Sequence, residues 1–115
     1  MQRLGKAQAL DAMKKYNKLV RDKIPAILKA KGKRVVVRVL DDKEYLEQLI
    51  DKLYEEVEEF DEDQSVEEMA DIIEVLMALA DVLGIKQSEL KTVRDNKAAT
   101  RGVFKRRVFL ERVEG

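Results

Sequence analysis

The chain contains no cysteine, no histidine and no tryptophan, and only 5% of its 115 residues are aromatic. Without cysteine it forms no disulfide and has no thiol nucleophile, and without histidine it lacks an imidazole base and the usual zinc ligands. Any metal site must therefore use oxygen ligands, which favours magnesium, manganese or calcium. Because aromatic residues are scarce, no side chain stands out as a stacking partner for a base.

Long apolar stretches are also absent. No run approaches the roughly 20 residues that cross a bilayer, and residues 1–15 lack the apolar centre of a secretory signal, so we expect a cytoplasmic protein without membrane association. The length fits one domain with one core. A hydrophobic fraction of 45% with 40% charged residues is typical of long helices with solvated faces.

The net charge of zero combines segments of opposite sign. Residues 41–74 hold 16 of the 23 acidic residues and only two bases, Lys43 and Lys52. Residues 1–40 and 86–107 carry nearly all the other bases. This pattern fits a metal site bordered by phosphate-binding groups, and it equally fits simple neutralisation along solvated helices. Nucleic-acid binding is not expected, because no aromatic residues are interleaved with the bases and the acidic face would oppose it.

Two long helices are predicted in the acidic half. Residues 41–44 offer a capping start, and the apolar residues that follow repeat with a period of about 3.6. Residues 61–64 form a polar turn. Ser65 and Glu68 have the spacing of a capping box for the second helix, which is predicted to stop at Gly84.

The other segments are predicted less directly. Residues 1–15 favour a first helix, an extension that the core does not need. Asp22 is predicted to cap a short helix that has Pro25 in its first turn and ends near Gly32. Ser88 is predicted to cap a last helix that continues to about residue 100.

Two segments are rich in β-branched residues and are predicted as strands, residues 34–40 (RVVVRVL) and residues 107–113 (RVFLERV). The expected fold is therefore mainly α, a helical bundle with an acidic helical hairpin, and a minor two-stranded sheet is left open.

Four carboxylates are predicted to meet in the hairpin. Glu56 and Glu59 are three residues apart, as are Glu68 and Asp71, so each pair projects from one side of its helix. Both pairs lie about 9 Å from the hairpin tip and border the apolar stripes. Carboxylates that point into a partly buried site repel one another and are costly to desolvate unless a cation neutralises them. A divalent metal supplies that charge; a solvated acidic face, or ion pairs with Lys or Arg from another segment, are the structural alternatives.

The pattern Glu55-Glu56-x-x-Glu59 followed by Glu68-x-x-Asp71 resembles the signature of the MazG-like all-α nucleoside triphosphate pyrophosphohydrolases. That superfamily also contains dimeric dUTPases, dCTPases and phosphoribosyl-ATP pyrophosphohydrolases. Residues 16–25 (YNKLVRDKIP) resemble the opening of a predicted house-cleaning subfamily. The resemblance covers residues 16 to about 110, so residues 16–115 are predicted to form the MazG-like domain.

The resemblance implies roles for the acidic residues. Glu56, Glu59, Glu68 and Asp71 would bind magnesium, or manganese in its place. Glu55 would lie next to these ligands without binding the metal itself, or would assist the attacking water. Glu55 and Glu56 are therefore the candidate catalytic residues. The rotation of the helices selects the same four ligands and does not select Glu55.

Basic residues are the candidates for holding phosphates. By the resemblance, the helix after the hairpin supplies such side chains, and three of its bases share one face at i, i+3 and i+7. A solvated basic face is the alternative for them. The candidate substrate-binding residues are Lys18, Arg21, Lys23, Arg94, Lys97 and Arg101.

The implied reaction is attack of a water molecule on the α-phosphorus of a nucleoside triphosphate, which need not be one of the ordinary four, with release of the monophosphate and pyrophosphate. With no histidine, the general base is a carboxylate or the metal hydroxide. Because a lone hairpin leaves apolar surface exposed, we expect a homodimer or higher oligomer. Phosphoribosyl-ATP is a rival substrate, and a non-catalytic helical interaction module is a rival function.

Overall fold

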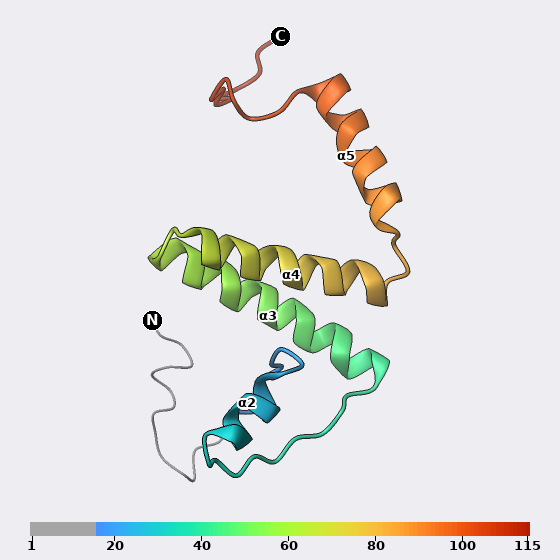
Figure 1. Ribbon diagram of the computed structural model, residues 1–115. Helices are drawn as coiled ribbons and strands as arrows, with labels where there is room; N and C mark the ends of the chain where they lie inside the picture. Colours follow the sequence, from blue (N-terminus) through green and yellow to red (C-terminus); the bar gives the residue numbers. More distant parts are fainter. Residues whose placement is uncertain (1–15) are drawn as a thin grey trace.

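The computed structural model describes residues 16–115, and the predicted helix over residues 1–15 lies outside the described residues. Within residues 16–115, four α-helices follow one another and no strand forms. They are α2 (Ile24–Ala30), α3 (Asp42–Glu62), α4 (Val66–Val82) and α5 (Gln87–Arg101) (Figure 1). The mainly α prediction is confirmed.

Helices α3 and α4 form the predicted antiparallel hairpin (Figure 1). The Asp41 side chain accepts a hydrogen bond from the Glu44 N–H at 2.8 Å and so caps α3. The Ser65 hydroxyl accepts one from the Glu68 N–H at 3.3 Å and caps α4. At the other end of α4, Gly84 adopts a φ of 72°, a left-handed conformation that glycine tolerates best. The predicted starts and the predicted stop are therefore confirmed.

The core is the seam between these two helices. Leu49 of α3 packs with Val75 and Leu79 of α4, and all three are buried. The half-buried side chains packed around them are Leu19, Tyr45, Leu46, Leu53, Ala78 and Val82. Among the described residues, Leu19 is the one member that comes from outside the hairpin, and it brings the segment before α2 against the seam. This segment, residues 16–23, is called the basic segment below.

Two helix starts differ from the prediction. Helix α2 follows Lys23, because a turn in which the Ile24 N–H donates to the Arg21 carbonyl oxygen already contains Asp22. Helix α5 follows Lys86, whose extended backbone starts the helix and whose carbonyl oxygen accepts from the Leu90 N–H at 3.0 Å. Neither start has a side-chain cap. Ser88 therefore lies inside α5, and neither Asp22 nor Ser88 is an N-cap.

The two predicted strands were wrong. Residues 34–40 and 107–113 are irregular, and Figure 1 shows them on opposite sides of the hairpin, before α3 and after α5. A strand requires a neighbouring strand for its backbone N–H and C=O groups, and neither segment pairs with one within residues 16–115. The Arg107 N–H instead donates to the Phe104 carbonyl oxygen at 3.2 Å. Val36 and Val39 are 101% and 97% exposed. β-Branched residues such as these favour a strand locally, but without a neighbouring strand the segment stays irregular.

One side chain of the first irregular segment is fixed to the hairpin. The Arg38 guanidinium forms two parallel hydrogen bonds to the Glu44 carboxylate, at 3.0 and 2.8 Å. This hydrogen bonding lowers the pKa of Glu44 and raises that of Arg38. The contact ties the connection from α2 to the first turn of α3.

Helix α5 and the residues after it leave the hairpin (Figure 1). Helix α5 buries no residue, and α3 with α4 is the only pair of described helices that packs extensively. The radius of gyration is 18.6 Å, whereas a compact domain of this length has about 13 Å. None of the described helices combines the length and the apolar run needed to span a bilayer.

Candidate metal centre

Three of the predicted ligands come together between α3 and α4. One carboxylate oxygen each of Glu56, Glu68 and Asp71 lies within 4.8 Å of the other two. Glu56 is only 3% exposed, and Glu68 and Asp71 are half-buried. The hairpin register and the Ser65 cap, which fixes the first turn of α4, bring these carboxylates to the same level. Such spacing is suitable for one small cation bound by oxygen atoms.

Glu59, the fourth predicted ligand, does not join this group. It is half-buried on α3, one turn nearer the hairpin tip than Glu56. Three residues advance an α-helix by about 300°, so Glu59 points about 60° further from the seam than Glu56 does. The spacing in the sequence placed both side chains on one side of α3, and the structure separates the one that faces α4 from the one that borders it.

Two lysine side chains, those of Lys18 and Lys52, lie beside Glu55. Its Oε2 atom lies 3.4 Å from the Nζ atom of Lys18 and 3.4 Å from that of Lys52. Lys52 also approaches the Oε2 atom of Glu56 at 3.6 Å. Lys52 stands three and four residues before these glutamates, a spacing that predicts ion pairs along a helix. Sequence reasoning overlooked this partner, although the spacing contained the signal.

Arg21 reaches the candidate metal centre from the basic segment. Its Nη2 atom lies 2.6 Å from Oδ1 of Asp71, with both side chains partly exposed. An ion pair with a base from another segment was the structural alternative to a metal, and the structure contains that pair for Asp71. Arg21 and Lys18 thus place two cationic groups beside the carboxylates. Lys23 is exposed at the start of α2.

The bases of α5 are not brought to the carboxylates. Arg94, Lys97 and Arg101 are exposed on a helix that does not pack on the hairpin. Their shared face is present, but within one chain it lies away from the candidate metal centre (Figure 1). Of the six predicted phosphate-binding residues, Lys18 and Arg21 are the two that contact the acidic motif in the described chain.

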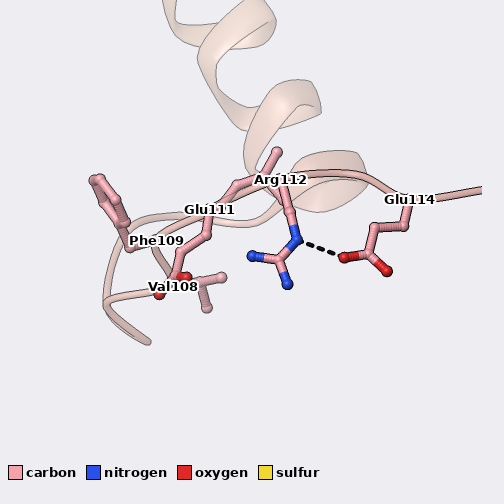
Figure 2. Close-up of a pocket in the computed structure, with 6 residues that line it drawn as sticks. Val108, Phe109, Glu111, Arg112 and Glu114 are labelled. Atoms are coloured by element: carbon pink, nitrogen blue, oxygen red, sulfur yellow. Dashed lines mark hydrogen bonds and ion pairs between the residues drawn. The ribbon is translucent and has the colours of Figure 1, made fainter.

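A cavity of about 210 Å³ opens beside Glu55. It is lined by Asn17, Lys18, Leu19, Gln48, Asp51, Lys52 and Glu55. Figure 2 shows a different hollow, formed by the curled segment after α5, where Arg112 pairs with Glu114. None of the predicted site residues lines that second hollow. The cavity between the basic segment and α3 therefore lies beside Glu55 and Lys52, and Lys52 in turn approaches Glu56.

Comparison of the chain with protein-family models, with curated proteins and with solved structures found no match.

Proposed function

We propose that the chain is a magnesium-dependent nucleotide pyrophosphohydrolase of the MazG-like kind, which cleaves a nucleoside triphosphate to the monophosphate and pyrophosphate. The observation that carries this proposal is the convergence of Glu56, Glu68 and Asp71 from two antiparallel helices. These carboxylates belong to the motif on which the resemblance rests.

The residues present fit a magnesium ion. Three carboxylates within 4.8 Å supply hard oxygen ligands, and magnesium is bound through carboxylates together with water and substrate oxygens. At an effective dielectric constant of about 20, each pair of carboxylates at this separation repels by at least about 3.5 kcal/mol. When bound, magnesium would neutralise this charge, acidify a water molecule and polarise phosphoryl oxygens.

The flanking residues have roles that their positions support. Lys18 and Arg21 project from the basic segment beside the carboxylates, where their donors can turn from Glu55 and Asp71 to the oxygens of a polyphosphate. By the resemblance, Glu55 would accept the proton of the attacking water; its carboxylate lies beside Lys18 and Lys52, one residue before Glu56. The water oxygen bonds to the α-phosphorus, and the bond to the bridging oxygen of the pyrophosphate breaks.

A non-catalytic helical module is the second candidate, and the ion pairs favour it. Arg21 at 2.6 Å from Asp71 and Lys52 at 3.6 Å from Glu56 offset part of the acidic charge without any metal. If the clustered carboxylates serve only to form these ion pairs and bind no metal, magnesium will neither raise the melting temperature nor support turnover. The two candidates therefore differ in their response to magnesium alone.

The test is pyrophosphate release from a panel of ordinary and damaged nucleoside triphosphates and phosphoribosyl-ATP, with magnesium and with chelator. The wild-type chain is expected to release pyrophosphate from at least one substrate only with magnesium. Glu56→Gln should abolish release. Glu58→Gln is the matched control, because Glu58 is an exposed neighbour on the same helix, and it should keep activity. If the folded wild-type chain releases no pyrophosphate from any substrate of the panel, the proposal is refuted.

A further inference from the structure

The hairpin has one side that nothing in the described chain covers. Three side chains of α3 and three of α4 follow each other at steps of four and three residues, so each set forms a stripe. The rotation of the two antiparallel helices places both stripes on the same side, away from Glu56 and Asp71. We call this side the open face; its residues are Ile50, Tyr54, Val57, Met69, Ile73 and Leu76, all of them exposed.

The composition of α4 shows that its exposure is unusual. Twelve of its 17 residues are apolar and the other five are acidic. A helix that is apolar around most of its circumference is normally buried on more than one side. Here α3 covers only one side, and Ile73 remains 52% exposed. The open face is thus incomplete in a single chain.

The second exposed apolar region is the C-terminal arm, defined as α5 with residues 102–115. Seven of its large apolar side chains are 47–98% exposed, and Figure 2 shows two of them, Val108 and Phe109, on the curled segment after α5. These side chains are Val93, Val103, Phe104, Val108, Phe109, Leu110 and Val113. The C-terminal arm and the open face are therefore both exposed apolar surfaces, and each would be stabilised by packing against another apolar surface.

Charge decides what covers the open face. Residues 41–83 contain 17 acidic and two basic residues, a net charge of −15, whereas residues 86–115 contain nine basic and four acidic residues, a net charge of +5. Two hairpins packed face to face would bring two strongly negative surfaces together. An arm packed on a hairpin brings opposite charges together and buries apolar surface from both.

Within one chain, arm and hairpin do not pack on each other, because α5 leads away from α4 (Figure 1). We infer that two copies of the chain exchange their C-terminal arms, so that the arm of each copy covers the open face of the other. A two-fold arrangement of this kind closes on itself and leaves neither surface exposed. The inference concerns assembly and does not depend on the proposed chemistry.

The first test is the mass in solution, measured by sedimentation equilibrium. The wild-type chain of 13.3 kDa is expected to be a dimer. Phe109→Asp in the arm and Ile73→Lys on the open face should each raise the dimer dissociation constant at least about tenfold. Val36→Asp is the control, since Val36 is fully exposed outside both regions, and it should leave the dimer intact. Far-UV circular dichroism confirms that each variant keeps its helices.

The second test distinguishes exchange from other packings and uses the absence of native cysteine. Ile73→Cys and Val108→Cys variants are mixed and treated with a short bis-maleimide. Exchange predicts cross-linked dimers that contain one copy of each variant, above the level found when Val36→Cys replaces Val108→Cys. A monomeric wild-type chain, cross-links between two Ile73→Cys copies alone, or a bridge within one chain carrying both changes would each overturn the inference.

Discussion

Replacing Glu56 with glutamine separates a metal ligand from a structural partner. Glu56 is 3% exposed, shares its site with Glu68 and Asp71 within 4.8 Å, and has Lys52 at 3.6 Å. At an effective dielectric constant of about 20 and the outer separation of 4.8 Å, the two carboxylates repel Glu56 by about 7 kcal/mol in total, while Lys52 attracts it by about 4.6 kcal/mol. Glutamine keeps the shape and removes the charge. Because Arg21 at 2.6 Å from Asp71 offsets part of the repulsion, the net repulsion that disappears is smaller than the difference of about 2 kcal/mol.

The expected result in chelator is therefore a free energy of unfolding that equals the wild-type value or exceeds it by up to about 2 kcal/mol. The magnesium response should change in the opposite direction. At a hundred times its dissociation constant, a ligand that binds only the folded state stabilises that state by about 2.7 kcal/mol. The wild-type chain should gain this stability, and Glu56→Gln should lose most of the gain.

The assay is thermal and urea unfolding followed by far-UV circular dichroism, with magnesium and with chelator, for the wild-type chain, Glu56→Gln and Glu58→Gln. Glu58→Gln should respond to magnesium as the wild-type chain does, because its carboxylate is exposed. A Glu56→Gln chain that unfolds in chelator would show that Glu56 holds the fold through its ion pairs. A variant that responds to magnesium as fully as the wild-type chain would remove Glu56 from the metal centre.

Three further predictions concern the frame that positions the candidate metal centre. Ser65→Ala should lower the free energy of unfolding by about 1 kcal/mol in urea melts, because it removes the cap of α4, whereas Ser88→Ala should leave it within about 0.5 kcal/mol. Leu49→Ala should lower it by about 2–5 kcal/mol, and an unchanged melt would show that the α3–α4 seam is not the core. Because Arg38 lowers the pKa of Glu44 in the folded chain, this pair stabilises the fold above the unfolded-state pKa of Glu44 and loses that effect as the pH falls through the folded-state pKa. Arg38→Gln should therefore raise the Glu44 pKa in an NMR titration and weaken the loss of stability in acid; an unchanged pKa would refute the pairing.

Local signals were sufficient for the hairpin. The Ser65 cap and Gly84 act over a few residues, so the sequence predicts them directly. The turn before Ser65 is shorter than the predicted residues 61–64, because α3 continues to Glu62. The same holds for the convergence of Glu56 with Glu68 and Asp71, because helical rotation and equal distance from the tip determine it.

The remaining features depend on contacts between distant segments. Residues 34–40 have the composition of a strand, but composition does not reveal whether a partner strand is within reach. The basic segment folds against the hairpin, which brings Arg21 to Asp71 across 50 residues of sequence, and no local pattern indicates that distance. Sequence likewise shows that Arg94 and Lys97 share a face of α5, but not that α5 leads away from the carboxylates.

The most direct test of the proposed reaction locates the new phosphorus–oxygen bond. The chain is incubated with magnesium and a cleaved triphosphate in water enriched in heavy oxygen, and both products are analysed by mass spectrometry. Attack on the α-phosphorus predicts one heavy oxygen atom in the nucleoside monophosphate and none in the pyrophosphate. Label in the pyrophosphate, or release of inorganic phosphate with a nucleoside diphosphate, would contradict the proposed reaction.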